Sequence, residues 1–362
     1  MSFVEFHDVK KTYHMGEVEI PALQGVNFEI EKGEFCVIVG ASGAGKTTIL
    51  NILGGMDMLT EGRVLLDGKE ISSYGKKQLT DYRRYDIGFV FQFYNLMPGL
   101  TALENVELAA QLSADPLDPE ELICQVGLGD RKNHFPSKLS GGQQQRVAIA
   151  RALVSSDAVI VMDEPITNLD AKLREEMLIE IRQIQKNIGT TIFYITHDQE
   201  ASLQLCDKMA IMDQNGKLCQ LGADEDIILR PSNRFVFEFI GVSNFFTLSR
   251  LGGDWCFAGN RNLVFDGTVP AQFDKAGTVD MGVRPNNITF DPASPVKAKV
   301  KRSVFLGSEY DYFVEFDGRE VRVQKNAFDA MQTGAVEQEG DTVGLKFVGP
   351  EFYPTAGKEE AV

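Results

Sequence analysis

The chain has 362 residues, which is too long for one typical domain and favours two or three. Hydrophobic residues make up 43% and charged residues 24%, as in ordinary globular proteins, and no run approaches the roughly 18 apolar residues of a membrane-spanning helix. The net charge of −16 argues against general nucleic-acid binding, because a phosphate backbone would repel the chain.

The N-terminal run MSFVEFHDVKK is mixed and acidic, without the basic start and apolar core of a secretory signal. The five cysteines show neither a CxxC pair nor metal-ligand spacing: Cys36, Cys124, Cys206, Cys219 and Cys256. Scattered free thiols favour a reducing cytoplasm. We therefore expect a soluble chain that is free to dock on a membrane partner.

Strand and helix patterns alternate over roughly the first 200 residues. Strand patterns cover 4–13 and 26–40, a helix is expected at 46–56, and a hairpin-like pair of strands at 62–71. Helical spacing follows at 101–112, 119–128 and 141–154, then a buried strand at 158–165, an amphipathic helix at 171–189 and a strand at 191–197. This alternation predicts a mostly parallel sheet with helices on its faces.

The pattern changes after residues 230–235. From about Asn244 onward, short strand patterns are separated by turns, at 254–267, 278–291, 296–307, 310–324 and 341–349. Asp317-Gly318 and the polar neighbours of Asn260 are typical turn signals. We expect a separate, small, all-β and barrel-like module here.

A phosphate-binding loop is the first motif that carries chemistry. Residues 40–48, GASGAGKTT, match GxxxxGK[ST], and glycines in such a loop let backbone N–H groups surround phosphate. Lys46 supplies a charge, Thr47 supplies a hydroxyl for Mg²⁺, and the following helix points its positive end at the phosphate. A chance match to a glycine-rich turn is disfavoured, because the motif lies between an apolar strand and a helix. The predicted nucleotide-binding residues are Gly40, Ala41, Ser42, Gly43, Ala44, Gly45, Lys46, Thr47 and Thr48.

The stretch VIVMDEP at 159–165 is an apolar strand that ends in two carboxylates. Asp163 would reach the Mg²⁺ shell, and Glu164 would reach a water beside the γ-phosphate of ATP. Taken alone, such a pair is more often a helix cap or a solvated strand end. Together with the phosphate loop, it indicates hydrolysis of ATP.

Six motifs in a fixed order resemble those of the ATP-binding-cassette (ABC) ATPases over about residues 3–230. They are the phosphate loop, Gln92, LSGGQ at 139–143, Asp163-Glu164, Asp170 in TNLD, and His197 in ITHD. The resemblance implies an α/β P-loop NTPase fold, with a RecA-like core, an antiparallel β subdomain and a helical subdomain at about 93–153. It also implies that two copies stack head to tail around two ATP molecules. Ser140, Gly141, Gly142 and Gln143 would then meet the γ-phosphate bound by the other copy, at a helix N-terminus that favours anions.

The same resemblance implies further roles. Tyr13 would stack on adenine, although an aromatic residue at an exposed strand end is also common. Gln92 would reach Mg²⁺ and the attacking water, and His197 would hold the γ-phosphate, so that Glu164, His197, Gln92 and Lys46 form the catalytic set. Asp170 would act across the dimer interface. Thr167 and Asn168 depart mildly from the small residues that usually precede this aspartate.

The two halves of the chain resemble different cassettes. VEIPALQGV and the runs up to QQQRVAIARAL resemble lipoprotein-release and macrolide-export ATPases. From LDAKLREEM onward the chain resembles solute-importer ATPases of the maltose, spermidine and ferric-ion type, which carry a C-terminal OB-like TOBE domain. A whole extra domain weighs more than shared core motifs, so the expected domains are an ATPase at 1–235 and a TOBE domain at 236–362.

The importer resemblance implies an ATPase that energises uptake of a polyamine, ferric ion or sugar. It would work as a homodimer on two permease subunits, at the cytoplasmic face of the membrane, with an extracytoplasmic solute-binding protein and no nucleic acid. The alternatives are an export or lipoprotein-release ATPase and, more remotely, a soluble cassette of translation or DNA repair. The solute is left open, because its recognition lies in the permeases and the binding protein. Binding of a regulator by the C-terminal domain is left open as well.

Overall fold

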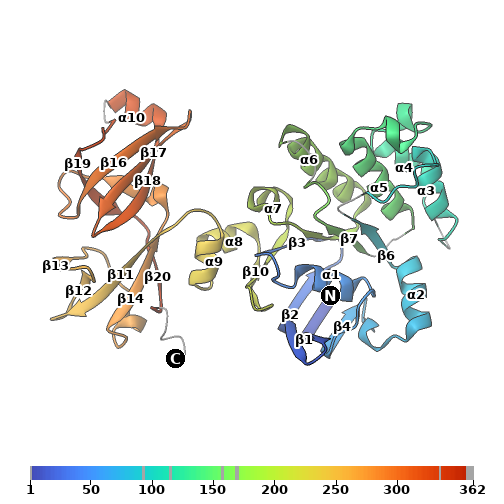
Figure 1. Cartoon of the computed structure of the whole chain (residues 1–362), viewed down its shortest axis with the longest axis horizontal. Helices are drawn as coiled ribbons and strands as arrows, with labels where there is room; N and C mark the ends of the chain where they lie inside the picture. The colour runs from blue at the N-terminus through green and yellow to red at the C-terminus, as the bar shows by residue number, and fades with distance from the viewer. Residues whose placement is uncertain are drawn as a thin grey trace. The chain divides into compact units, whose positions relative to one another are not determined.

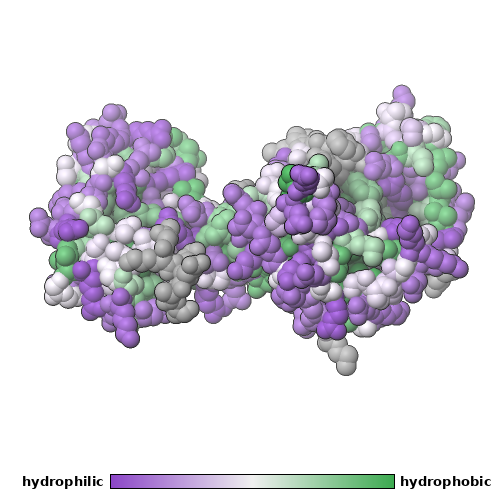
Figure 2. Space-filling model, turned by 60° about the horizontal axis from the view of Figure 1, so that its bottom comes forward, coloured by the Kyte–Doolittle hydropathy of each residue, from purple (hydrophilic) through white to green (hydrophobic). Residues whose placement is uncertain are grey.

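The computed structural model describes residues 2–91, 94–113, 116–155, 159–167, 171–333 and 336–355. The chain divides into two compact units, Met1–Ser232 and Asn233–Val362 (Figure 1). On the face drawn in Figure 2, hydrophilic residues dominate the surface of both units, in keeping with the charged fraction of 24%. Within the described ranges, no helix is long and apolar enough to cross a membrane.

The first unit begins with an antiparallel sheet in the order β2-β1-β4-β5. Its strands are β1 Ser2–Met15, β2 Val18–Glu31, β4 Glu61–Leu66 and β5 Lys69–Glu70. Alternate residues of β1 and β2 face one core, where the rings of Phe6 and Phe28 stack at 4.3 Å. This sheet forms one wall of the core that the phosphate loop and its helix also share.

A second sheet of the first unit has the order β10-β9-β3-β8-β7-β6. Its strands are β3 Phe35–Gly40, β6 Ile87–Val90, β7 Val159–Asp163, β8 Thr191–Ile195, β9 Lys208–Met212 and β10 Leu218–Gly222. All pairs are parallel except β9 with β10, which confirms the predicted mostly parallel sheet. Every residue of β3 and β8 is buried, as expected for central strands covered on both faces.

Eight α-helices lie in the described part of the first unit. They are α1 Lys46–Leu53, α2 Lys76–Tyr85, α3 Ala102–Ala110, α4 Pro119–Gln125, α5 Gly141–Ser155, α6 Ala171–Ile188, α7 Gln199–Leu205 and α8 Asp224–Leu229. Helices α3, α4 and α5 pack against one another within the range predicted as a helical subdomain, and α5 also packs on β6 (Figure 1). Helix α2 was not predicted, because Tyr82 is its only buried residue and most of its other residues are polar.

The second unit begins with helix α9 Arg234–Phe239 and contains two five-stranded sheets, β13-β12-β11-β14-β20 and β15-β19-β16-β17-β18. The first sheet is built from β11 Asn244–Leu251, β12 Asp254–Phe257, β13 Asn260–Val264, β14 Thr278–Val283 and β20 Glu351–Tyr353. The second is built from β15 Ile288–Phe290, β16 Lys297–Phe305, β17 Glu309–Phe316, β18 Arg319–Asn326 and β19 Thr342–Phe347. Apolar residues of both sheets share one core.

Two features of the second unit differ from the expected run of strands. Helix α10, Ala327–Thr333, follows β18. Helix α9 belongs to this unit, because Arg234 pairs with the buried Asp280 and Phe237 packs edge-on against Phe245. The division between the units therefore follows Ser232, whereas the sequence suggested a boundary after Phe235.

Candidate functional site

The phosphate loop connects β3 to α1, and backbone geometry requires glycine at two of its positions. A Cβ atom on Gly40 would lie 2.6 Å from the carbonyl oxygen of Met212 on β9. Gly45 has φ 85°, and a Cβ there would lie 2.3 Å from the carbonyl oxygen of Ala22. Larger residues would push the loop off the sheet edge, so the motif glycines fix where the loop lies.

The other loop residues present an exposed apex on a buried base. Ser42 and Gly43 are exposed, Ala41 and Gly45 are half-buried, and Ala44 and Thr48 are buried. Gly45 caps α1, whose first N–H groups point out of the helix end toward the loop. This arrangement suits an anion held at the apex.

Lys46 points back across the loop. Its side chain is only 8% exposed, and Nζ donates to the carbonyl oxygens of Gly40 at 3.0 Å and Ala41 at 2.9 Å. Burial lowers the pKa of Lys46, while the carboxylates of Glu164 and Asp163 oppose this shift. The ammonium group is thus held beside the loop apex with two carboxylates near it.

Thr47 and Asp163 meet although 116 residues separate them. Thr47 Oγ1, on α1, donates to Asp163 Oδ2, at the end of β7, at 3.2 Å. Burial raises the pKa of Asp163, and the hydrogen bond from Thr47 opposes this shift. A hydroxyl and a carboxylate oxygen side by side next to a phosphate loop are the hard donors that Mg²⁺ prefers, so these residues fit that ion.

Glu164 follows Asp163 in an unusual backbone conformation. Its φ of 45° lies in the left-handed region that residues with a side chain seldom adopt. Its N–H donates to the carbonyl oxygen of Ile195 at 3.0 Å, and its Oε1 lies 3.2 Å from Nδ1 of His197. Strained residues cluster at functional sites, which accords with the role predicted for Glu164.

The LSGGQ motif forms the start of α5. Ser140 N–H donates to Oε1 of Gln143 at 3.0 Å, and Gln143 N–H donates to Oγ of Ser140 at 3.3 Å, a reciprocal cap of the helix end. Ser140 is exposed, Gly141 and Gln143 are half-buried, and Gly142 is buried. The motif therefore presents the serine and the free N–H groups of a 15-residue helix to the surface.

Tyr13 lies near the end of β1. Its hydroxyl donates to Oδ2 of Asp57 at 2.7 Å, and the Nζ atom of Lys11 lies 4.7 Å from the ring centre. Burial raises the pKa of the Tyr13 phenol, and the Thr48 hydroxyl beside it opposes this shift. The ring is thus anchored next to α1, which suits the predicted contact with a nucleotide base.

Gln92 and Asp170 lie outside the described residues. The phosphate loop, Asp163, Glu164 and His197 are brought together at the carboxyl ends of parallel strands β3, β7 and β8, the usual place for ligands in such sheets.

Two residues, Arg151 and Thr167, make contacts that the sequence analysis did not predict. Arg151 on α5 donates to the carbonyl oxygens of Asn95 at 2.6 Å and Tyr94 at 3.1 Å, in the segment just after Gln92. Thr167 Oγ1 lies 3.1 Å from the carbonyl oxygen of Glu164 and 3.4 Å from its Oε2. The sequence signal for the Arg151 contact is an arginine that stands between Ala150 and Ala152, both of which are buried.

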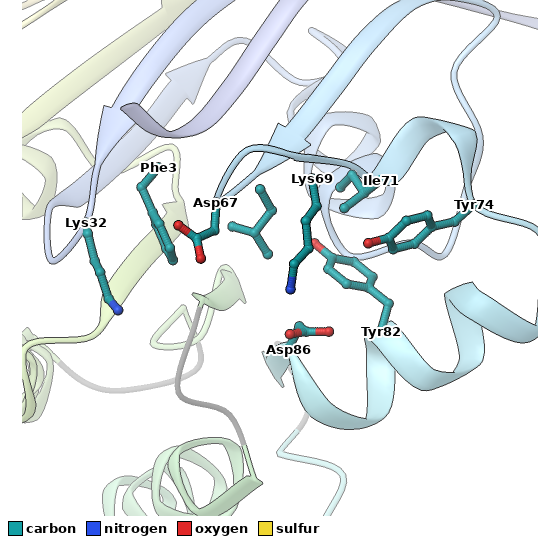
Figure 3. A pocket seen from close by; sticks show the side chains of 9 residues that line it. Phe3, Lys32, Asp67, Lys69, Ile71, Tyr74, Tyr82 and Asp86 are labelled. Carbon is teal, nitrogen blue, oxygen red and sulfur yellow. The ribbon is translucent and has the colours of Figure 1, made fainter. Parts of the chain in front are cut away.

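A cavity of about 120 Å³ lies elsewhere in the first unit, between the ends of β1 and β4 and helix α2 (Figure 3). Lys69 points toward Asp86 across it, and burial raises the pKa of Asp86 while Lys69 opposes the shift. The lining residues are Phe3, Lys32, Leu66, Asp67, Lys69, Ile71, Tyr74, Tyr82 and Asp86. Among the predicted site residues that the structure describes, none lines this cavity, which is therefore separate from the phosphate loop.

Both units of the chain match known protein families. The family model described as ABC transporter matches residues 23–167, and the TOBE domain model matches residues 281–349. The Spermidine/putrescine import ATP-binding protein PotA of Thermobifida fusca is 35% identical over 376 residues, covering 98% of this chain and 94% of that protein. The Fe(3+) ions import ATP-binding protein FbpC of Rhizobium etli is 35% identical over 321 residues, covering 87% of this chain and 88% of that protein.

A solved structure gives the same result for the cassette. The dimeric post-hydrolysis structure of the ATP-binding cassette MJ0796, bound to ADP and Pi, has a TM-score of 0.54 and 39% identity, and it covers 61% of this chain and 98% of that chain. These matches confirm the predicted fold class, a P-loop ATPase followed by a TOBE domain. The chain belongs to the ATP-binding subunits of ABC transporters and is an ATPase.

Proposed function

We propose that this ATPase energises uptake of a small polar solute, with polyamines and ferric ion as the leading candidates. The observation that carries the proposal is the extent of similarity to import proteins. The PotA relative from Thermobifida fusca matches 98% of this chain, so the likeness includes both the cassette and the TOBE domain. The ferric-ion relative from Rhizobium etli extends over 87% of the chain.

The phosphate loop and Lys46 would bind the phosphates of ATP. In the structure, the Lys46 ammonium is satisfied by the carbonyl oxygens of Gly40 and Ala41. Phosphate oxygens carry full negative charge and would compete well for the same donors. The N–H groups at the start of α1 would contribute further hydrogen bonds without cost in reorganisation.

Thr47, Asp163 and Gln92 would hold Mg²⁺. The ion, when bound, neutralises charge on the phosphates. The close approach of Thr47 Oγ1 to Asp163 Oδ2 supports this assignment, since the two oxygens are already side by side.

Glu164 would act as the general base. Its carboxylate would accept a proton from the water that attacks the γ-phosphate, while His197 at 3.2 Å would hold Oε1 and the γ-phosphate in register. A fixed base raises the fraction of water molecules that are oriented for in-line attack.

The complete site would need a second copy of the chain. Ser140 is exposed at the N-terminus of α5, where it is available to a nucleotide bound by another subunit. Gly141, Gly142, Gln143 and Asp170 would join it there. The solved cassette with 39% identity is dimeric, which supports a homodimer.

Permease subunits would dock on the side of the cassette formed by α2 and α3. A hollow there is lined by Thr80, Arg83, Arg84, Ala109 and Leu112. Leu108 and Leu112 are exposed apolar residues on or just after α3, and Met97 and Tyr85 are exposed as well. Apolar side chains beside arginines suit a protein partner. The chain would then be a peripheral protein at the cytoplasmic face, working with an extracytoplasmic solute-binding protein.

The export alternative rests on the N-terminal motifs and is not favoured. The Thermobifida fusca and Rhizobium etli relatives, which match 98% and 87% of this chain, are import proteins by name. A C-terminal domain such as 281–349 is the feature that the export cassettes lack.

Deletion of the gene in its own host, followed by uptake assays with labelled spermidine and labelled ferric ion, tests the proposal. We expect the uptake of one of these solutes to be lost, restored by the wild-type chain and not restored by Glu164→Gln. Unchanged uptake of every solute tested, with loss of release of a lipoprotein or drug instead, would contradict import.

A further inference from the structure

Thr167 contacts both the backbone and the side chain of Glu164. Its N–H lies 3.5 Å and its Oγ1 lies 3.1 Å from the carbonyl oxygen of Glu164, and the same Oγ1 lies 3.4 Å from Oε2. We propose that Thr167 is a positioning residue, whose hydroxyl holds the carboxylate of Glu164 in the orientation needed to deprotonate water. This inference rests on the proposed role of Glu164 as the general base.

The backbone of Glu164 needs support from outside itself. With φ 45°, the residue occupies a conformation that its neighbours must enforce. The Ile195 carbonyl oxygen accepts from the N–H of Glu164 on one side, and Thr167 donates to the carbonyl oxygen of Glu164 on the other. Both backbone polar groups of Glu164, its N–H and its carbonyl oxygen, therefore have a hydrogen-bond partner.

Each carboxylate oxygen of Glu164 has a different neighbour. Oε1 faces Nδ1 of His197 and Oε2 faces Oγ1 of Thr167. The His197 side chain is 62% exposed, whereas the Glu164 side chain is 27% exposed. Water competes strongly for an exposed imidazole, so His197 alone is a weak constraint on the carboxylate. The contact of Thr167 with Oε2 adds a second constraint, on the other oxygen of the carboxylate.

Thr167 is itself held in place. Ile166, directly before it, is 3% exposed, and Thr167 is half-buried. A hydroxyl has one hydrogen, so Thr167 donates either to the carbonyl oxygen or to Oε2 at any moment. Rotation about one bond moves the donor from the backbone to the carboxylate. A donor at Oε2 restrains that oxygen and thereby orients the whole carboxylate group.

The test compares Thr167→Val, Thr167→Ser and Glu164→Gln in the full chain. Valine keeps the shape and removes the hydroxyl, and serine keeps the hydroxyl. Thr289→Val, at an exposed position on β15 in the second unit, is the matched control. Steady-state ATP hydrolysis is measured over a range of ATP concentrations to give kcat and KM, and thermal melting of each variant recognises a folding defect separately.

We expect Thr167→Val to lower kcat roughly tenfold, with KM changed less than about twofold. The change should appear in kcat and not in KM, because the hydroxyl contacts the general base and not the nucleotide. Serine, which keeps the hydroxyl, should restore most of the rate. These results together support the proposal.

Three outcomes would overturn it. One is wild-type kcat in Thr167→Val while Glu164→Gln is inactive. Another is a rate as low in the serine variant as in the valine variant, which would mean that the methyl group matters and the hydroxyl does not. The third is a KM raised in Thr167→Val as strongly as kcat is lowered, which would mean that the hydroxyl acts in nucleotide binding. Wild-type hydrolysis in Glu164→Gln is distinguishable from all three, because it would refute the proposed base itself.

Discussion

Arg151, on the last turns of α5, donates from Nη1 to the main-chain carbonyl oxygen of Asn95 at 2.6 Å. A second bond joins Nη2 to the carbonyl oxygen of Tyr94 at 3.1 Å. Asn95 has φ 50°, so this arginine fixes a strained turn. The helix that begins at the exposed Ser140 is thereby tied to the segment that follows Gln92.

We predict that Arg151→Ala lowers the free energy of unfolding by about 1–3 kcal/mol, because it leaves two carbonyl groups without their donors. Arg151→Lys should recover only part of this loss, since an ammonium group cannot span two carbonyl oxygens as a planar guanidinium does. Urea unfolding followed by circular dichroism measures both. Arg319→Ala, at an exposed position on β18, is the control and should change stability by less than about 0.5 kcal/mol. An unchanged unfolding midpoint in Arg151→Ala would show that the two bonds contribute nothing.

Gly45→Ala should disrupt the phosphate loop much more than Gly43→Ala. Both glycines have positive φ, 85° and 82°, so alanine is strained at either position. Only at Gly45 would the new Cβ also meet a backbone atom, 2.3 Å from the Ala22 carbonyl oxygen, whereas the space at Gly43 is open. We expect Gly45→Ala to cost several kcal/mol of stability and Gly43→Ala about 1 kcal/mol. Thermal melting of the two variants without nucleotide compares them, and equal melting temperatures would contradict the geometric argument.

Asp163→Asn should stabilise the nucleotide-free chain at neutral pH. Burial holds the pKa of Asp163 above its ordinary value of 3.8, so the folded chain binds this proton more tightly than the unfolded chain. That contribution favours folding at low pH and is lost as the pH rises through the raised pKa. At neutral pH the ionised carboxylate opposes folding, and its removal should raise Tm by about 2 °C.

The measurement is Tm in EDTA, at pH 7 and again near pH 4, where we expect the difference between variant and wild type to shrink. Asp254→Asn changes an exposed carboxylate on β12 and serves as the control. A lower Tm for Asp163→Asn at pH 7 would mean that the bond from Thr47 outweighs the cost of burial.

Local pattern predicted the parts of the site that depend on neighbours in sequence. The apolar strand before Gly40 and the helix after Lys46 are both present, because the glycine motif, the apolar run and the helical spacing all lie within about 20 residues. Strand β7 lies within the predicted range of 158–165 and ends at Asp163. Each of these elements can be predicted from the spacing of apolar residues within its own sequence.

Contacts between distant segments could not be predicted in the same way. The bond from Tyr13 to Asp57 spans 44 residues, and that from Arg151 to Asn95 spans 56. Main-chain carbonyl groups accept many of these bonds, and every residue has one, so the sequence does not distinguish which carbonyl is used. The bond that supports the strained backbone of Glu164 belongs to the same class, because its acceptor is the carbonyl oxygen of Ile195 on β8.

Mixing two inactive variants should restore hydrolysis if each site is shared between two copies. Lys46→Ala removes the phosphate-loop charge and Ser140→Arg blocks the motif at the start of α5, so each variant alone should hydrolyse ATP at least about 100-fold more slowly. In a mixed dimer, one site combines both defects. The other site pairs the intact phosphate loop of one copy with the intact LSGGQ motif of its partner. Random mixing at equal concentrations gives about half mixed dimers with one working site each, so we expect roughly a quarter of the wild-type rate if the sites act independently.

Mixing Lys46→Ala with Glu164→Gln is the control, since both changes lie on the phosphate-loop side and no intact site can form. Absence of any recovery in the first mixture, with mixed dimers demonstrated by differently tagged chains, would show that Ser140 does not act on the nucleotide of a partner.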